Sequence, residues 1–408
     1  MIFSPITCSL SPNTEISDVW TACKTLFMPW KWMTGGEITK VESWFHTRYP
    51  LYVSLSTNSG RSALYLLLQS FGIGEGDEVI VQSFTCVALP NAVLWTGATP
   101  VYADIDTRFN IDPLSIEKHI HPQTKAIIIQ NTFGIPAQYE KIAEIAKKQN
   151  ILCIEDCAHS LGGRYESGAL IGGVGDASFF SFGRDKIISS VFGGVGSIHK
   201  KHTKAVARFI SLHSKLQFPN PIWVFQQIFH PIAFSFILPL YSLGIGKALL
   251  FLLQKLKLLS FPVYKEEKEG KRPTDFPKKY PNALAQMLIP QLKKLERYTA
   301  QRTVISGYYK KSLGSSFSPM DLVTGSVFLR YPVLSQKRDE IISKAKSQGI
   351  LLGTWYSNIL DPKGTNFHNL YYTKGSCPKS ERCASLILNL PTRISLADAK
   401  KVVASLQQ

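Results

Sequence analysis

The 408-residue sequence is short of acidic residues and of metal-binding patterns. It holds 29 Asp and Glu against 46 Lys and Arg, which gives a formal net charge of +17. Its seven cysteines form no CxxC pair, and its histidines form no cluster at zinc spacing, so we expect no metal site. Because no zinc-finger or RNP-like pattern accompanies the positive charge, we expect no nucleic-acid partner. Phosphorylated substrates and anionic lipid remain as partners.

A secretory signal is also missing. The first 18 residues have neither the basic region nor the long apolar stretch of such a signal. An odd number of cysteines without a pairing pattern indicates reduced, mostly buried thiols. We therefore expect a cytoplasmic protein. Its length and its 45% apolar content suit one large globular domain with a smaller one.

Strand and helix patterns alternate from Ser59 onward. Short apolar runs such as "EVIVQS", "KAIIIQ" and "ILCIED" are separated by helical patterns such as "GRSALYLLLQSFG". This alternation predicts a mostly parallel sheet with helices on both faces. In such a sheet, ligands bind at the carboxyl ends of the strands. A weaker alternation over 320–408 predicts a small α+β domain.

One long stretch has no charged residue at all. Residues 222–246 contain no Asp, Glu, Lys or Arg, and the stretch is long enough to cross a bilayer. Pro231 and His230 argue against a straight spanning helix, whereas Trp223 and the flanking lysines suit a membrane interface. Two interpretations remain open. Residues 219–262 contact the membrane peripherally, or they pack as a helical pair on the protein's own core or on a second subunit.

Acidic residues stand at the end of one predicted strand. "ILCIED" ends in Glu155 and Asp156, and His159 follows three residues later. This order places a carboxylate at the ligand-bearing edge of the sheet. Asp156 alone would equally fit the N-cap of a helix that begins at Cys157.

A lysine follows the next strand. "GDASFFSF" ends in Ser181 and Phe182, and Lys186 lies in the turn beyond. Partial desolvation there would disfavour the charged amine and make it a better nucleophile. A lone lysine after a strand is more often solvated surface, so this position gains its meaning from the residues near it.

An anion site is predicted where "TNSGRSAL" leads into a helix. Free backbone N–H groups and the helix dipole favour an anion there, and Arg61 and Ser62 would add hydrogen bonds. By itself the turn could be an ordinary N-cap. An anion site, a carboxylate and a lysine together are what pyridoxal 5'-phosphate (PLP) requires for its phosphate, its pyridine nitrogen and its Schiff base. Lys186 would then anchor the cofactor and carry a proton.

The same motifs resemble the DegT/DnrJ/EryC1/StrS family of sugar aminotransferases, which have the aspartate aminotransferase-like PLP fold (fold type I). The resemblance runs from about Gly35 to the C-terminus, apart from the apolar insert. The segments that carry it are "SGRSAL", "GDEVIVQSFTCVALPNAVLWTGATPVYADID", "IEDCAHSLGG", "GDASFFSFGRDK" and "LNLPTRISLADAKKV".

The resemblance implies a role for each site residue. Lys186 holds the cofactor, Asp156 pairs with the pyridine nitrogen, and His159 lies near the ring hydroxyl. Relatives that dehydrate sugars have histidine in place of the lysine, so Lys186 implies transamination. The phosphate-binding residues would be Gly60, Arg61, Ser62 and Ser181.

The chain departs from the family pattern at three places. Cys86 stands where an aromatic residue usually stacks on the cofactor ring, and Phe84 is the candidate substitute. Arg61 replaces a threonine and would strengthen the phosphate site electrostatically. The Asn-x-Arg element that relatives lend across the dimer appears as "PKK" at 277–279, with Pro277 where Asn is expected.

The resemblance implies an α/β protein of PLP fold type I with a seven-stranded, mostly parallel sheet. The predicted organisation is an N-terminal segment at 1–50, the PLP-binding domain at 51–217, the hydrophobic insert with its charged linker at 218–272, and a connecting helix with the small α+β domain at 273–408.

The implied function is amino transfer, with glutamate as donor and a nucleotide-linked keto-sugar as acceptor. The product would serve the synthesis of a cell-surface polysaccharide, a lipid-linked glycan or a related glycoconjugate. We expect a homodimer in the cytoplasm, and one of the two open interpretations of the insert places it against the inner face of the membrane. The alternative is a non-catalytic regulatory or binding protein that keeps the PLP fold at the membrane surface.

Overall fold

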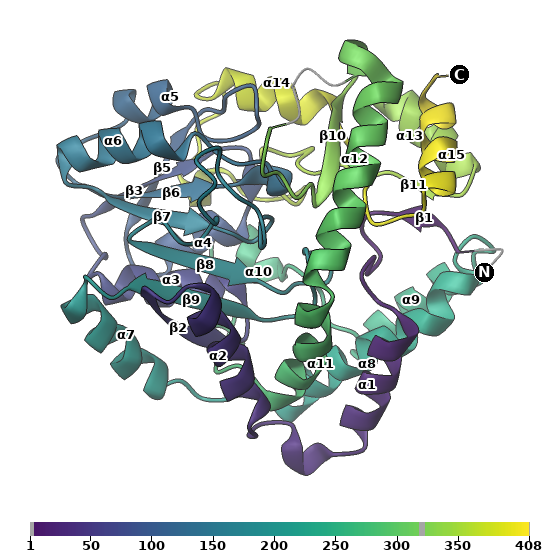
Figure 1. Ribbon diagram of the computed structural model, residues 1–408, viewed down its shortest axis with the longest axis horizontal. Helices are drawn as coiled ribbons and strands as arrows, with labels where there is room; N and C mark the ends of the chain where they lie inside the picture. The colour runs from purple at the N-terminus through teal and green to yellow at the C-terminus, as the bar shows by residue number, and fades with distance from the viewer. Residues whose placement is uncertain (1–3, 318–322, 408) are drawn as a thin grey trace.

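A seven-stranded sheet forms the centre of the computed structural model, which describes residues 4–317 and 323–407 (Figure 1). The strand order is β2–β9–β8–β7–β6–β3–β5, and of these strands β9 alone runs against its neighbours. The predicted, mostly parallel sheet is therefore confirmed. The strands are β2 Tyr52–Thr57, β3 Glu78–Gln82, β5 Thr99–Ala103, β6 Thr124–Gln130, β7 Leu152–Asp156, β8 Ala177–Ser181 and β9 Gly194–His199.

Helices cover both faces of the sheet because its strands are apolar on both sides. In β6, Ile128 faces one side, and Ile127 and Ile129 face the other. Helices α3, α4 and α7 pack on the Ile128 side, and α2, α5 and α6 pack on the opposite side. These helices are α2 Glu37–Arg48, α3 Gly60–Ser70, α4 Ala88–Leu94, α5 Pro113–Lys118, α6 Tyr139–Gln149 and α7 Thr203–Ser214.

A smaller α+β region lies at the C-terminal end of the chain. Its strands β10 and β13 pair antiparallel, and β1 near the N-terminus pairs with β11 of this region. Strand β12 pairs with β4, which joins the region to the large sheet domain. The elements are β1 Ile6–Thr7, β4 Thr85–Cys86, β10 Arg330–Leu334, α13 Arg338–Ser347, β11 Ile350–Leu351, β12 Leu360–Asp361, α14 Pro378–Leu386, β13 Ile387–Pro391 and α15 Leu396–Gln407.

Two helices bridge the large and small regions. In Figure 1, α12 rises between the sheet and the small region, and α11 leads into it from below. The helices are α11 Asn282–Lys293 and α12 Leu295–Phe317, and the short 3₁₀ segments are η1 Pro29–Lys31, η2 Thr132–Gly134, η3 Leu238–Leu240 and η4 His368–Leu370.

The apolar insert folds as helices. These are α8 Pro221–Ile237, α9 Ile245–Lys255 and the short α10 Lys265–Lys268. Helix α8 packs against α1 (Ile16–Leu26), α9 and α11. Within the described residues, one helix, Pro221–Leu240, is long and apolar enough to cross a membrane, but half of its apolar window is buried inside the protein. One side of the insert is thus part of the protein's own core.

Candidate active site

The residues predicted from the sequence gather around one cavity. It has a volume of about 500 Å³ and lies where β7 and β8 end, beside the start of α3. The N-terminal segment, the insert and the small region also contribute to its wall. The predicted residues on the wall are Gly60, Arg61, Cys86, Asp156, His159, Ser181 and Lys186.

The start of α3 forms a narrow cradle against the end of β8. A Cβ atom on Gly60 would lie only 2.9 Å from the Ser181 Cβ, so the helix can approach Ser181 this closely because position 60 is glycine. Ser59 caps the helix, its side chain accepting from the Ser62 N–H. The first N–H groups of a helix have no partner within it, and the cradle therefore offers donors to an anion.

Ser62 is the predicted site residue that does not line the cavity. Its hydroxyl donates to the Asn58 side chain at 2.8 Å and lies 2.8 Å from the Ser59 Oγ. The side chain is thus engaged inside the first turn of α3. The Ser62 hydroxyl is therefore not placed to donate directly to a phosphate in the cavity.

Arg61 lies on the wall but is already paired. Its guanidinium forms an ion pair with Glu267 of α10, whose side chain is fully buried, and donates to the Pro262 carbonyl at 2.9 Å. The guanidinium also lies 4.8 Å from the centre of the Phe276 ring. The expected extra charge on the phosphate site is therefore compensated by an acid of the linker, and the Arg61 side chain mainly joins α3 to α10.

Asp156 and Glu155 separate onto opposite faces of the sheet, as neighbours in a strand do. The Glu155 carboxylate has a structural role. It accepts hydrogen bonds from the N–H groups of the loop after it, including Gly172 at 2.7 Å and Gly175 at 2.7 Å. Asp156 points to the cavity, where its Oδ1 accepts from the Ala158 N–H at 2.9 Å. Turns follow it, so the alternative of a helix cap is wrong.

Electrostatics favour a cation at Asp156. Among the described residues it forms no ion pair, and burial raises the pKa of its carboxyl to about 6 although the Lys186 charge lowers it. A buried carboxylate without a counter-charge is stabilised by a protonated ring nitrogen placed against it. This is the role that the sequence predicts for Asp156.

His159 is held as a neutral ring. Its Nδ1 accepts from the Phe133 N–H at 3.2 Å, and its Nε2 lies 3.5 Å from the Tyr356 hydroxyl. Burial, together with the Lys186 and Arg330 charges, holds the pKa of His159 well below its usual value. Because Nδ1 accepts, the ring proton is on Nε2, which can donate to a hydroxyl or phenolate oxygen.

Lys186 presents a free amine, and its loop is fixed from a distance. Among the described residues, no hydrogen bond or ion pair occupies its Nζ. The Asn13 side-chain amide donates to the Lys186 carbonyl, and Asn13 Oδ1 accepts from the buried Arg302 at 2.7 Å. The backbone of this loop is therefore positioned by the N-terminal segment and α12.

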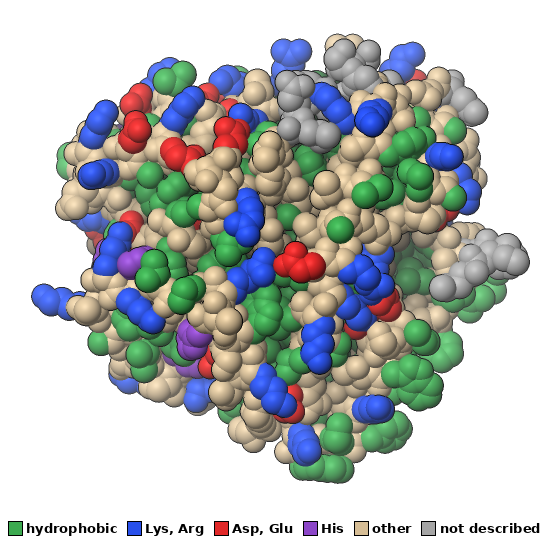
Figure 2. Space-filling view, viewed as in Figure 1, with side chains coloured by type: hydrophobic (Ala, Val, Ile, Leu, Met, Phe, Trp, Pro, Cys, Tyr) green, Lys and Arg blue, Asp and Glu red, His purple; other side chains and the backbone are tan. Residues whose placement is uncertain are grey.

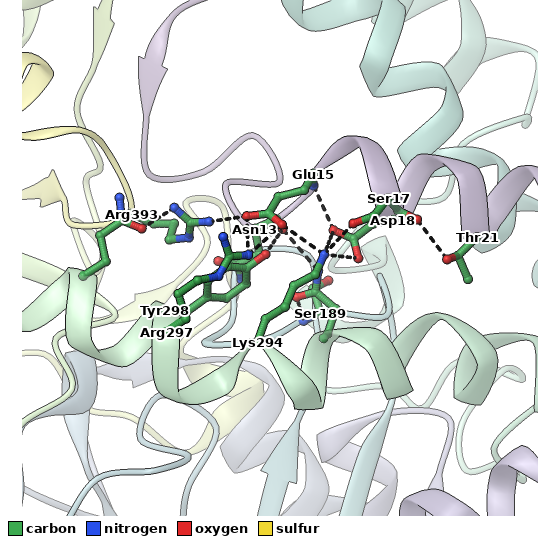
Figure 3. A network of polar contacts seen from close by, with 12 residues as sticks. Asn13, Glu15, Ser17, Asp18, Thr21, Ser189, Lys294, Arg297, Tyr298 and Arg393 are labelled. Carbon is green, nitrogen blue, oxygen red and sulfur yellow. Dashed lines mark hydrogen bonds and ion pairs between the residues drawn. The ribbon is translucent and has the colours of Figure 1, made fainter.

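The network around Asn13 continues along α12 (Figure 3). Glu15 forms ion pairs with Arg297 and Arg393 at 2.7 Å, and Lys294 pairs with Asp18 at 2.9 Å. These charges clamp the N-terminal segment onto α12 beside the lysine loop. The sequence has no local pattern that would have identified Asn13, because its partners lie 173 and 289 residues away.

The expected aromatic substitute is not on the cavity wall. Phe84 is fully buried and packs edge to face on the Tyr356 ring with the centroids 5.4 Å apart. Cys86 occupies the wall, where burial raises the pKa of its thiol to about 11. Aromatic surface comes instead from Phe179, Trp355 and Tyr356.

Several further titratable residues on the wall were not predicted, among them Arg330, Asp185 and Asp361. Arg330 pairs with Asp185 at 2.6 Å, and its guanidinium lies 3.6 Å from the centre of the Trp355 ring. Asp361 also lines the cavity, and burial raises the pKa of its carboxyl to about 7. These residues come from the small region or precede Lys186, and they meet only through the tertiary fold.

The "PKK" element lies beside the cradle of the same chain. The Asn58 N–H donates to the Lys278 carbonyl at 3.1 Å, and the Lys278 N–H donates to Asn58 Oδ1 at 3.0 Å. Segment 277–279 thus runs along the turn before α3. Whether it also reaches a second subunit stays a prediction.

The residues present fit PLP. The glycine cradle with the Ser181 hydroxyl suits the phosphate, and the unpaired Asp156 carboxylate suits the ring nitrogen. Lys186 supplies an amine without a competing partner in the described structure. The cavity volume of about 500 Å³ falls within the range of small-molecule sites.

Comparisons with known proteins agree with this geometry. A model of the DegT/DnrJ/EryC1/StrS aminotransferase family matches residues 17–223 and 255–407, leaving out the middle of the insert. GDP-perosamine synthase from Caulobacter vibrioides is 29% identical over 394 residues, which cover 93% of this chain and 91% of the relative.

Two further relatives are similar. The dTDP-3-amino-3,6-dideoxy-alpha-D-galactopyranose transaminase of Aneurinibacillus thermoaerophilus is 41% identical over 152 residues, or 37% of this chain and 42% of the relative. The structure of Helicobacter pylori PseC, an aminotransferase involved in the biosynthesis of pseudoaminic acid, has a TM-score of 0.73 at 20% identity. It covers 99% of this chain, and this chain covers 97% of it.

Proposed function

The chain belongs to the DegT/DnrJ/EryC1/StrS aminotransferase family, and from this premise we propose that it transfers an amino group from glutamate to a keto-sugar linked to a nucleotide. It is an aminotransferase, and the cofactor of its family is PLP. The names of two relatives, a GDP-perosamine synthase and a dTDP-amino-sugar transaminase, support a nucleotide-linked acceptor. The product would enter a polysaccharide, a lipid-linked glycan or a related glycoconjugate.

The observation that carries the proposal is the meeting of Lys186, Asp156 and the start of α3 in one cavity. PLP, when bound, supplies an electron-withdrawing ring that stabilises negative charge on the substrate carbon. Asp156 holds the ring nitrogen protonated. The Nζ of Lys186 moves the proton at the carbon that bears the transferred nitrogen, which is general acid-base work.

The other polar residues orient the reactants. His159 would donate from Nε2 to the hydroxyl of a bound PLP, and the Gly60 cradle with Ser181 would hold its phosphate. The aromatic side chains of Phe179, Trp355 and Tyr356 on the wall would help to exclude water from a bound cofactor. A non-catalytic protein that keeps the fold is not favoured, because it would need neither a free lysine amine nor an unpaired buried carboxylate.

The direct test is amine transfer from glutamate to a panel of nucleotide-linked keto-sugars, read as 2-oxoglutarate formed. The wild type, loaded with PLP, is expected to show the absorbance band of the bound cofactor and to turn over one or more acceptors. Lys186→Ala is expected to lose the band and about 10²–10⁴-fold in rate. Lys204→Ala, a change at an exposed lysine of α7, is the control. A wild type that takes up no PLP would refute the proposal.

A homodimer is part of the proposal. Segment 277–279 lies beside the phosphate cradle at the turn before α3, where a family dimer would share residues between subunits. Sedimentation equilibrium is expected to give twice the mass of the 45.6 kDa chain. A monomer that retains full activity would exclude a shared site.

Peripheral membrane contact, at the inner face of the cytoplasmic membrane, is also proposed. Helix α9 is apolar on two sides: Leu249, Leu250 and Leu253 pack on α8, while Ile245 and Leu256 are more than half exposed. Apolar side chains that gather on an exposed surface mark a contact with another protein or with lipid. In Figure 2, apolar side chains gather at the lower right, over α1 and the insert.

Charge supports lipid as the partner of this face. Residues 219–264 contain no Asp or Glu, and their exposed lysines at 247, 255 and 257 lie on or just beyond α9. Apolar residues flanked by lysine are typical of segments that lie in the interface of an anionic membrane.

A further inference from the structure

A second polar cluster lines the cavity, away from the cofactor residues. Arg184 and His230 both lie on the wall, and neither has a place in the cofactor site described above. Arg184 lies two residues before Lys186 in the same loop, whereas His230 belongs to α8 of the insert. The cluster therefore exists only because the insert covers this side of the cavity.

Arg184 is a half-buried cation without a carboxylate partner among the described residues. Its Nη2 donates to the Ser260 carbonyl at 2.7 Å and to the Ser260 hydroxyl at 2.5 Å. Among the described residues it forms no ion pair, because the neighbouring Asp185 is taken by Arg330. Its Nε is buried and has no hydrogen-bond partner. Burial lowers the pKa of Arg184 to about 10, so the guanidinium is still charged at neutral pH.

Residues of the insert fix the position of this guanidinium. The Ser260 hydroxyl donates to Gln227 at 2.8 Å, and the Gln227 amide donates to the Trp223 carbonyl of α8 at 2.7 Å. Each polar group in this series fixes the next one, so the Arg184 guanidinium is tied to the insert. An arrangement that fixes a charged group and leaves it uncompensated is costly unless an anion binds there.

His230 adds a second unpaired nitrogen. The ring is 1% exposed, stacks on Phe234 with the centroids 4.1 Å apart, and has its Nε2 2.8 Å from the Ser11 hydroxyl. Its Nδ1 is buried without a partner. When Ser11 donates to Nε2, the neutral ring carries its proton on Nδ1 and can donate to an anion.

Apolar side chains make up much of this wall. Phe234, Leu250, Leu259 and Phe261 line the cavity on the insert side. Arginine is the side chain that best matches the oxygens of a phosphate, because its planar guanidinium presents a fork of donors. A cation and a neutral donor beside an apolar wall suit a phosphate that is attached to a ring system or a hydrocarbon.

We propose that Arg184 and His230 bind the phosphate of the carrier to which the acceptor sugar is attached. The proposal rests on the proposed function, since it names the subsite for the part of the substrate that does not react. The shared chemistry is a diphosphate, whose source is either a nucleotide or a membrane-bound isoprenoid. It also assigns a task to the insert, which supplies Ser260, Gln227 and His230.

Inorganic pyrophosphate is the first probe, titrated by calorimetry into the PLP-loaded, full-length protein. Arg184→Gln is expected to weaken binding at least about tenfold, because a charge-assisted bond to the anion is lost. His230→Gln is expected to weaken it less, since it removes a neutral donor. Arg164→Gln, which removes an exposed charge off the cavity wall, is the control and should bind as the wild type does. Equal affinity of wild type and Arg184→Gln would overturn the proposal.

Kinetics separate this site from the amino-transfer chemistry. Arg184→Gln is expected to keep the wild-type cofactor absorbance and the wild-type rate of its half-reaction with glutamate, and to raise the KM of the acceptor more than it lowers kcat. A rise in the KM of glutamate instead would assign Arg184 to the donor carboxylate and overturn the proposal. If neither the wild type nor Arg184→Gln reacts with glutamate, the proposed function is wrong. The pyrophosphate titration then still tests whether Arg184 binds a phosphate.

Competition distinguishes the two sources of diphosphate. UDP and geranyl diphosphate are each tested for displacement of pyrophosphate from wild type and from Arg184→Gln. Displacement by UDP that depends on Arg184 indicates a nucleotide carrier, and displacement by geranyl diphosphate indicates an isoprenoid carrier lying on the apolar wall. Either result supports the site. Displacement by neither would contradict it.

Discussion

At the scale of single residues, Asp156 makes cofactor binding depend on pH. Burial raises the pKa of its carboxyl from 3.8 to about 6, so below about pH 6 the residue is mostly protonated. A cation against Asp156 favours the ionised form, and binding of the protonated ring nitrogen therefore releases a proton from the protonated enzyme. PLP affinity is expected to fall by up to about tenfold for each pH unit below this pKa.

The measurement is the PLP dissociation constant between about pH 5 and 8, with Asp156→Asn as the comparison. The amide cannot ionise, so this variant should bind more weakly at neutral pH and lose the step near pH 6. Any pH dependence that both proteins share belongs to other groups. An unchanged step in Asp156→Asn would show that another group titrates.

Ionisation of the Asp156 carboxyl also affects the stability of the folded protein. Because the pKa of Asp156 is higher in the folded protein than in the unfolded chain, the folded state binds the proton more tightly. The contribution of Asp156 to the free energy of unfolding is therefore largest below its unfolded pKa and declines as the pH rises to about 6. PLP should offset this loss, so thermal melts with and without PLP are expected to diverge above about pH 6.

At the scale of elements, Arg61 and Glu267 join α3 to α10. Glu267 is fully buried, and Arg61→Gln leaves its carboxylate without a counter-charge, so we expect a loss of about 3–5 kcal/mol in the free energy of unfolding. The double variant Arg61→Gln, Glu267→Gln should lose less than the sum of the two single changes, because neither partner is then left charged and alone.

Urea unfolding of the four proteins measures this coupling. Lys401→Gln, which breaks an exposed pair with Asp398 on α15, is the control and should leave the midpoint unchanged. Additive losses in the double variant would mean that the two side chains act independently.

The elements themselves were largely predictable from the sequence. The apolar runs of β6 and β7 identify strands, and the residues after them predict where Asp156 and Lys186 meet. Contacts made through distant parts of the chain were not predictable. Glu267, the partner of Arg61, lies 206 residues away from it, and no periodicity links the two.

Side-chain direction is a second property that the sequence does not determine. Ser62 and Phe84 have the right sequence position for the site, yet the first turn of α3 engages Ser62 and the core buries Phe84. In the insert, apolarity predicted helices but could not separate the buried side of α9 from the exposed side. Packing decides these questions, and one chain's pattern does not contain it.

At the scale of the whole molecule, net charge and the insert act together. The full-length protein is expected to sediment with anionic vesicles at low salt and to be released as salt rises, because a Debye length of about 10 Å at 0.1 M screens the lysines. Phe251→Asp with Leu256→Asp places two acids on the exposed side of α9 and should reduce binding at all salt concentrations. Leu114→Asp, on exposed α5 far from the insert, is the control.

The vesicle experiment also tests the alternative that the insert packs on a second subunit. If the α9 variant binds vesicles like the wild type, the insert does not contact lipid. If it instead shifts the protein from dimer to monomer, the exposed side of α9 is a subunit contact. Both results are read on the same samples by sedimentation.

The contact from Asn13 to the lysine loop also orders events during synthesis of the chain. The ribosome releases Asn13 early, but its partner Arg302 follows 289 residues later, and strand β1 must wait for β11. The sheet can form before then, since its last strand ends at His199. The first residues of the chain, with β1 and Asn13, therefore stay unattached while the sheet forms, and the lysine loop takes its final shape only after α12 has emerged.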